Sequence, residues 1–293
     1  MNPKKILVTG CAGFIGSNLT ARLVRDGYFV VGLDNLNDYY NPLWKIENIS
    51  SYENNKNFNF FKGDILNADL LDRLFKKYQF DYIAHLAARA GVRPSILDPK
   101  LYEEVNVRGT LNLLDLAKDY KIKKFIFASS SSVYGNQSKV PFSESDPVNS
   151  PISPYAATKK AGEMLCFTYS HLYNLSTICL RFFTVYGPGG RPDMAPYLFT
   201  QAILKRKPIK KFGTGTTSRD YTYIDDIVDG ISSAIKYECK YEIFNLGDNH
   251  PITLNKFINI LEKITGKEAI IQNAEMQPGD VHSTYADIRK AKK

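Results

Sequence analysis

The sequence lacks any long hydrophobic run. None of its apolar stretches approaches the roughly 18 consecutive residues that a membrane-spanning helix needs. The first apolar run, Ile6-Leu7-Val8, is also too short for the hydrophobic region of a signal peptide. We therefore expect a cytoplasmic protein that does not associate with a membrane.

Cysteine and histidine are scarce and scattered. Cys11, Cys166, Cys179 and Cys239 have neither the spacing of a disulfide framework nor that of a zinc site. The four histidines are equally isolated from one another. We predict no metal site and assign these side chains to the core or the surface.

The chain also lacks a basic block with interleaved aromatic residues of the kind that binds nucleic acid. The formal net charge is +8, but the cations are dispersed apart from small clusters such as residues 205–207. A phosphorylated small molecule accounts for this mild excess, and nucleic acid remains a minor alternative. A chain of 293 residues with 44% hydrophobic residues can bury a large core in one or two domains.

The segment 153–159, Ser-Pro-Tyr-Ala-Ala-Thr-Lys, is a candidate for acid–base chemistry. Ser153 and Pro154 favour a helix start, so Tyr155 and Lys159, four residues apart, project from one helix face. A nearby ammonium lowers the pKa of a phenol from its ordinary value of about 10, which would make Tyr155 a proton acceptor. Such a pair also occurs on many solvated helix faces, so the function needs support from the rest of the chain.

That support comes first from a glycine turn near the N-terminus. Residues 5–9 read as a buried strand, and Gly10, Gly13 and Gly16 follow before a helical pattern that ends near Gly27. The first glycine permits the turn, the second admits a pyrophosphate, and the third lets helix and strand pack closely. The helix N-terminus offers free N–H groups to the phosphates, so the turn predicts a dinucleotide site.

An acidic residue completes this unit. The next strand, residues 29–33, ends at Asp34, about 20 residues beyond the glycines, where a carboxylate accepts hydrogen bonds from the adenosine ribose. A carboxylate there disfavours a 2′-phosphate, so we expect NAD rather than NADP. Asp64 follows the next predicted strand, where it would either meet the adenine edge or cap a helix.

Strands and helices alternate as far as residue 180. This pattern predicts an α/β fold with a Rossmann-type, doubly wound parallel sheet. We expect an NAD-binding domain over residues 1–180, joined by a returning strand near 241–247, and a smaller C-terminal lobe over 181–293 that mainly binds substrate. The remaining predicted segments are a long loop with one helical turn at 35–55, strands at 58–61 and 125–128, a strand that runs into a small-residue turn at 82–88, and helices at 69–78 and 100–120.

Ligands of such sheets bind at the carboxyl ends of the strands. Residues 129–132, four serines, and residues 184–187 should both lie there, and small residues at 86–88 suit the close passage of a cofactor. We expect at least one functional serine. In the C-terminal lobe, the helical apolar stripe at 254–264 is interpreted as core.

The whole chain resembles the extended short-chain dehydrogenase/reductases, and among them the NAD-dependent nucleotide-sugar epimerases. The resemblance rests on Gly10, Gly13, Gly16, Asp34, Ser130, Tyr155 and Lys159. Within the family the chain is most similar to the UDP-glucuronate 4-epimerase group, through residues 34–42, 87–93, 181–188, 190–194 and 276–281. The stretch 219–226 is shared widely among nucleotide-sugar enzymes.

The resemblance implies a role for each matching residue. Tyr155 is expected to be the base, Lys159 its partner and a ligand of the cofactor ribose, and Ser130 a hydrogen-bond donor to the reacting sugar oxygen. The substrate is expected to contact Ser131, Ser132, Thr184, Arg191, Arg219 and Asp280, with Arg219 on the diphosphate. The cofactor is expected to contact Gly10, Gly13, Phe14, Ile15, Gly16, Asp34, Asn35, Asp64, Ile65, Leu86, Ala87, Ala88, Tyr155 and Lys159.

The implied reaction is NAD-dependent 4-epimerisation of a UDP-sugar through a 4-keto intermediate, from UDP-glucuronate to UDP-galacturonate. Related dehydratases and decarboxylases carry a carboxylate near Ser131 or Ser132, and here both positions are serine. The alternatives are UDP-glucose or UDP-N-acetylglucosamine 4-epimerase and, from another class, a non-catalytic NAD-binding regulator. The family also implies a homodimer through helices 100–120 and 154–173.

Overall fold

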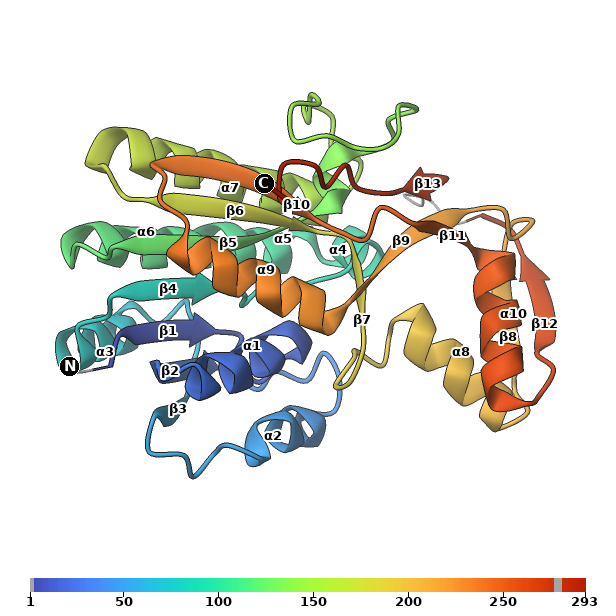
Figure 1. The fold of residues 1–293 in the computed structure, drawn as a ribbon, viewed down its shortest axis with the longest axis horizontal. Coiled ribbons are helices and arrows are strands. Elements are labelled where there is room, and N and C mark those ends of the chain that lie inside the picture. Colours follow the sequence, from blue (N-terminus) through green and yellow to red (C-terminus); the bar gives the residue numbers. More distant parts are fainter. Residues whose placement is uncertain (1–2, 277–280) are drawn as a thin grey trace.

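A seven-stranded parallel sheet forms the centre of the molecule (Figure 1). The computed structural model describes residues 3–276 and 281–293. The strand order is β10-β6-β5-β4-β1-β2-β3. Successive strands are added on one side of β1 as far as β3 and on its other side from β4 onwards, as in a doubly wound fold. The strands are β1 (Lys5–Thr9), β2 (Phe29–Asp34), β3 (Phe58–Lys62), β4 (Tyr82–His85), β5 (Lys124–Ser130), β6 (Thr177–Phe182) and β10 (Tyr241–Leu246).

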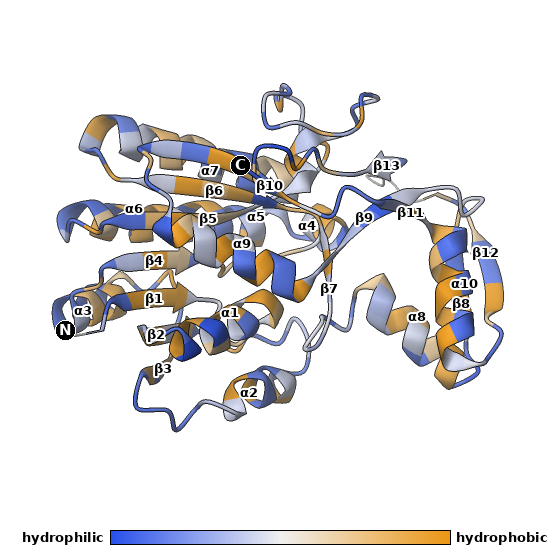
Figure 2. Ribbon diagram, in the orientation of Figure 1, coloured by the Kyte–Doolittle hydropathy of each residue, from blue (hydrophilic) through white to orange (hydrophobic). Residues whose placement is uncertain are grey.

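Helices cover both faces of this sheet. Ile6 and Val8 pack in one core with the side chains of α1 (Phe14–Arg25) and α9 (Ile224–Lys236). Leu7 points to the opposite face and packs with α3 (Ala68–Tyr78), α6 (Gly109–Asp119) and α7 (Pro154–Tyr173). Figure 2 shows these strands as hydrophobic segments between two helical layers. Burial on both faces explains the near-continuous apolar strands, and the predicted fold class is confirmed.

A smaller lobe follows β6. One part is a sheet built around β9 (Ser218–Tyr223), which pairs with β7 (Thr184–Tyr186), β11 (Pro251–Thr253) and β13 (Ser283–Thr284). The other part combines the strand pair β8 (Pro208–Phe212) and β12 (Ile270–Ala274) with α8 (Ala195–Leu204) and α10 (Leu254–Thr265). Between β9 and β11 the chain returns to the main sheet, where β10 pairs with β6.

The segment 35–55 contains more structure than the predicted loop. Residues Pro42–Ser50 form a nine-residue helix, α2. Asn41 caps it by accepting a hydrogen bond from the backbone N–H of Leu43, and Pro42 occupies the first turn. The prediction was wrong because only Lys45 and Ile49 of this helix are buried, which leaves almost no apolar periodicity.

Other boundaries also differ from the expectation. The predicted helix 100–120 has three consecutive parts: α5 (Pro99–Glu103), a π-helical turn (Glu104–Arg108) and α6. In the segment 82–88, predicted as a strand that runs into a turn, the strand ends at His85, and a short helix that was not predicted, α4 (Val92–Leu97), follows. The strand expected at 125–128 extends through Ser130, and residues 131–134 form a 3-10 turn.

The apolar stripe of α10 is only partly core. Ile258 is buried, whereas Ile264 keeps 77% of its surface exposed. One side of α10 packs against α8, and Phe257 of the stripe contacts Phe199 of α8 and Tyr221 of β9. The interpretation of the whole stripe as core was therefore wrong.

No helix in the described part of the chain is long and apolar enough to cross a membrane.

Candidate active site

A cavity of about 410 Å³ lies at the carboxyl ends of β1, β2, β4, β5 and β6. Its walls come from the glycine turn, the loops after β2 and β4, the serine segment after β5, the start of α7 and the loop after β7. All residues predicted to hold the cofactor or to carry catalysis line this cavity. The sheet topology brings them together because parallel strands present their carboxyl ends at one edge.

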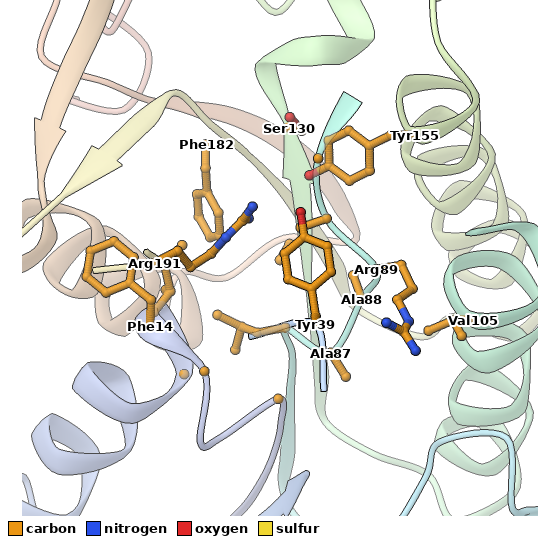
Figure 3. Close-up of a pocket in the computed structure, with 18 of the residues that line it drawn as sticks. Phe14, Tyr39, Ala87, Ala88, Arg89, Val105, Ser130, Tyr155, Phe182 and Arg191 are labelled. Atoms are coloured by element: carbon orange, nitrogen blue, oxygen red, sulfur yellow. The ribbon is translucent and has the colours of Figure 1, made fainter. Parts of the chain in front are cut away.

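Tyr155 and Ser130 lie side by side in this cavity (Figure 3). Ser153 caps α7 by accepting a hydrogen bond from the Ala156 N–H at 3.1 Å, which fixes the first turn that carries Tyr155. The Ser130 hydroxyl lies at the end of β5 and donates a hydrogen bond to the Ser132 hydroxyl at 3.1 Å. The helix start and the strand end therefore present two hydroxyl groups to the same space.

Burial raises the pKa of Tyr155, and the hydrogen bond with Ser130 and the charge of Arg191 offset only part of this rise. Lys159 is buried, which lowers its pKa to about 8. Its Nζ donates to the Ala128 carbonyl at 2.7 Å and lies 6.0 Å from the centre of the Tyr155 ring. Lys159 is thus directed to the end of β5 in this structure, and its effect on the pKa of Tyr155 stays a prediction.

The glycine turn leaves no room for larger residues. Gly10 has a positive φ of 70°, and a Cβ on it would lie 2.7 Å from the backbone nitrogen of Ala87. A Cβ on Gly16 would lie 2.0 Å from the carbonyl oxygen of Gly10. The first glycine thus permits contact between the turn and the end of β4, and the third brings α1 onto the turn, as the sequence pattern predicts.

Asp34 is 8% exposed and ends β2. Its carboxylate accepts hydrogen bonds from the backbone N–H groups of Ala12 at 3.1 Å and Leu36 at 2.8 Å. Burial raises its pKa, which these backbone donors partly oppose. The carboxylate is thus held between the glycine turn and the loop after β2, at the edge of the cavity.

Asp64 does not cap the following helix. The cap of α3 is Asn67, which accepts a hydrogen bond from the N–H of Leu70. The Asp64 carboxylate instead accepts from the Asn35 side chain at 2.7 Å and from the N–H of Leu66 at 2.9 Å. It therefore joins the two loops that follow β2 and β3, and the capping alternative is wrong.

The predicted substrate residues are only partly brought together. Ser131, Ser132, Thr184 and Arg191 line the cavity. Arg219 lies on β9 outside this lining, and its guanidinium donates to the Ser218 carbonyl at 2.8 Å. Asp280 lies outside the described residues.

Two further residues form a polar cluster with Arg191. The Arg191 guanidinium makes a bidentate ion pair with Asp193, at 3.0 Å from Nε to Oδ1 and 2.5 Å from Nη2 to Oδ2. The Tyr39 hydroxyl donates to Oδ2 of Asp193 at 3.1 Å, and the guanidinium lies 5.4 Å from the centre of the Tyr39 ring. This cluster connects the loop after β2 with the loop after β7.

Sequence reasoning assigned no role to several residues of the cavity wall. Tyr39, Lys45 and Arg89 line it, and the Lys45 Nζ is bound to the Asn37 carbonyl at 2.8 Å. Asn106, in the π-helical turn, holds both backbone polar groups of Arg89, at 2.8 and 3.0 Å. Tyr39 and Arg89 belong to family-like stretches, so a role could have been assigned; Asn106 gave no sequence signal.

Comparison with known proteins places this site in context. The sequence pattern of the NAD dependent epimerase/dehydratase family matches residues 6–247. A UDP-glucuronate 4-epimerase of Thermodesulfobacterium geofontis is 48% identical over 288 residues, which cover 98% of this chain and 88% of that protein.

Two solved structures share the fold of this chain. The UDP-glucuronic acid 4-epimerase of Bacillus cereus, in complex with UDP-glucuronic acid and NAD, has a TM-score of 0.92 and 42% identity, covering 98% of this chain and 91% of that chain. The UDP-glucose 4-epimerase of Thermotoga maritima, with UDP-glucose, has a TM-score of 0.90 and 35% identity, with the same coverage.

Proposed function

The chain belongs to the NAD dependent epimerase/dehydratase family, and on that premise we propose that it interconverts UDP-glucuronate and UDP-galacturonate by 4-epimerisation. The observation that carries this proposal is that Tyr155, Ser130 and Lys159 line one cavity together with the residues predicted to hold the cofactor. The domain roles follow from it: residues 1–180 bind the cofactor, and residues 181–293 mainly bind the nucleotide sugar.

The cavity fits NAD, the cofactor of the family. Gly10 and Gly16 pack directly against neighbouring backbone, and this part of the turn carries no side chains. A pyrophosphate can therefore approach the N-terminus of α1 without meeting a side chain there. Asp34 and the Asn35–Asp64 pair close the end of the cavity that would hold the adenosine. When bound, NAD⁺ accepts a hydride from sugar carbon C4 and returns it to the other face.

The residues of the chain supply the proton chemistry. Tyr155 takes the proton from the O4 hydroxyl and returns it at the end of the reaction. Ser130 hydrogen-bonds the O4 atom and keeps it within reach of the phenol. Lys159, which lines the same cavity, binds the cofactor ribose. The C4 carbonyl that forms between the two proton transfers is held by the Ser130 and Tyr155 hydroxyl groups.

The polar wall next to Ser130 suits an acidic sugar. Ser131, Ser132 and Thr184 would donate hydrogen bonds to the C6 carboxylate of a uronate, and Arg191 adds a positive charge on the sugar side. Because neither Ser131 nor Ser132 is a carboxylate, we expect neither elimination of water nor decarboxylation. Holding the carboxylate also opposes loss of CO₂ from the β-keto acid intermediate.

The test is a side-by-side incubation of the protein and NAD with UDP-glucuronate or UDP-glucose, followed by product analysis. We expect UDP-galacturonate as the main product and slower conversion of UDP-glucose. A UDP-pentose as the main product would refute epimerisation, and faster turnover of UDP-glucose would favour the UDP-glucose 4-epimerase alternative. Tight NAD binding without turnover of any nucleotide sugar would favour a regulator.

We also propose a homodimer that forms in the cytoplasm. Met164, Phe167 and Leu172 of α7 each keep more than half of their surface exposed, which a second copy could cover. The four cysteines are free, which suits a reducing compartment. Light scattering should give twice the mass of one chain, and Phe167→Glu should give a monomer. A monomeric wild type would contradict this assembly.

A further inference from the structure

Arg191 already has a carboxylate partner within the chain. Asp193, two residues later, accepts hydrogen bonds from Nε and Nη2 of the guanidinium, and the Tyr39 hydroxyl donates to the second oxygen of that carboxylate. The side chain of Arg191 is 21% exposed and that of Asp193 39% exposed. The guanidinium is thus partly withdrawn from water, the carboxylate stays exposed, and a residue from another loop fixes the orientation of the pair.

The guanidinium faces the space in which a sugar would lie. Figure 3 shows the Arg191 guanidinium and the hydroxyl groups of Tyr39 and Tyr155 turned towards the same part of the cavity. Because Tyr155 acts on the C4 hydroxyl, the next ring atom is C5, and the carboxylate is attached to C5, two bonds from C4. A uronate bound in this way brings a second carboxylate close to Arg191.

Two carboxylates then compete for one cation. A guanidinium that has lost part of its hydration needs an anion, and in the free protein Asp193 supplies it. A uronate carboxylate can replace Asp193, whereas a neutral hexose has no group that can do so. Asp193, at the more exposed end of the pair, can turn to solvent when it is replaced.

We propose that Asp193 is a specificity-determining residue that competes with the sugar carboxylate for Arg191. The role rests on the proposed function, since it needs an acidic sugar in the cavity. In the free protein the Arg191–Asp193 pair keeps the cation neutralised. A uronate that binds the guanidinium does so against the charge of Asp193, whether it replaces that carboxylate or uses the Nη1 N–H groups that Asp193 does not bind, and part of its binding energy is used in this competition.

The informative variant is Asp193→Asn. Asparagine retains the shape of the side chain and one carbonyl acceptor for Arg191, but it removes the competing charge. Affinity for UDP-glucuronate should rise at least about fivefold, which corresponds to about 1 kcal/mol. Affinity for UDP-glucose and for UDP should not rise, because neither ligand carries a sugar carboxylate. The variant would therefore discriminate more strongly between the acidic and the neutral sugar.

Isothermal titration calorimetry measures these affinities directly. All titrations use NAD-loaded protein in a Tyr155→Phe background, so that turnover does not change the ligand. Asp38→Asn is the matched control: it removes the same charge from the exposed loop after β2, away from the cavity lining. We expect it to leave the affinity for UDP-glucuronate within about twofold. In an Arg191→Ala background, Asp193→Asn should have no effect, as a double-mutant cycle requires.

Three results would overturn the role of Asp193. If Asp193→Asn leaves the affinity for UDP-glucuronate unchanged, Asp193 has no effect on substrate binding. If the variant binds UDP-glucuronate more weakly, Asp193 orients Arg191 and does not compete with the substrate. An equal gain for UDP-glucuronate, UDP-glucose and UDP would assign Arg191 to the diphosphate. Absence of binding of every UDP-sugar would refute the proposed function itself, together with this role, and is distinct from binding that the substitution does not change.

Discussion

Glu163 and Arg181 form a bidentate ion pair that is closed to solvent. The distances are 2.8 Å from Nε to Oε1 and 2.9 Å from Nη2 to Oε2, and the side chains are 0% and 1% exposed. The Ser129 hydroxyl donates to the same carboxylate at 2.7 Å. Since Glu163 lies on α7, two turns after Tyr155, the pair joins the helix of the proposed base to the ends of β5 and β6.

Breaking this pair from one side should be costly. Arg181→Met leaves the buried Glu163 carboxylate with Lys160, 3.4 Å away, as its remaining cation and without its bidentate partner, and we expect a loss of roughly 3–5 kcal/mol in the free energy of unfolding at neutral pH. Urea denaturation of the NAD-free protein measures this loss. The double variant Glu163→Met/Arg181→Met, which removes both charges, should recover most of it. A single variant within about 1 kcal/mol of the wild type would contradict the importance of the pair.

The same pair predicts the acid sensitivity of the fold. Burial opposes ionisation of Glu163, but Arg181 and Ser129 outweigh it and hold the pKa of Glu163 below its ordinary value. A carboxyl group with a lowered pKa in the folded state stabilises the protein above its unfolded pKa of about 4.3 and loses this contribution as the pH falls through the folded value. The double methionine variant should therefore show a shallower decline in stability below about pH 5 than the wild type. Equal slopes would refute this.

Tyr155→Phe should abolish most of the activity and little else. The substitution removes the phenol hydroxyl and keeps the ring volume, so folding and NAD binding should persist. A positioned acid–base group contributes roughly 10²- to 10⁴-fold to the rate, and turnover of UDP-glucuronate should fall at least that far. Near-normal turnover would leave the proposed mechanism without its base.

The pH dependence of turnover should distinguish the neighbours of Tyr155. The hydrogen bond with Ser130 lowers the pKa of the tyrosine, so Ser130→Ala should move the acidic limb of the pH–rate profile to higher pH. Lys159→Met should move the limb in the same direction if the ammonium stabilises the phenolate in the loaded enzyme. An unchanged limb in a residually active Lys159→Met protein would assign that effect to the positive charge of the cofactor.

Asp34 should set the choice of cofactor. Asp34→Ala removes the carboxylate predicted to meet the ribose hydroxyls, so NAD binding should weaken roughly tenfold or more. Discrimination against NADP should relax, because the charge that repels a 2′-phosphate is lost. Fluorescence titrations with both dinucleotides test this prediction. A wild type that prefers NADP would show that the role of Asp34 was assigned wrongly.

Local signals made the cofactor half of the site predictable. The turn at Gly10 is dictated by a positive φ and close backbone contacts, and both act within one strand–helix unit that the sequence displays. Helix α2 escaped prediction because a capping asparagine and a proline were its only signals within a polar segment. The interpretation of α10 as core was wrong because a helical apolar stripe does not reveal how much of the helix its neighbours cover.

The substrate side of the site depends on contacts that no local pattern reports. The hydrogen bond from Tyr39 to Asp193 joins residues 154 positions apart. The direction of the Lys159 ammonium towards Ala128 depends on how α7 packs against β5. Helical spacing predicts that Tyr155 and Lys159 share a face, and it cannot predict what else the lysine contacts on that face.

The return of β10 to the main sheet has a consequence for synthesis on the ribosome. Tyr241 pairs with Thr177, so β10, the strand that completes the seven-stranded sheet, is synthesised 64 residues after its partner β6. Until then β6 is an unpaired edge, and a nascent chain that has emerged only to residue 180 exposes its backbone groups to other chains. We expect the growing chain to need protection from aggregation during this interval, and the sheet to close late and slowly because the pairing spans so long a loop.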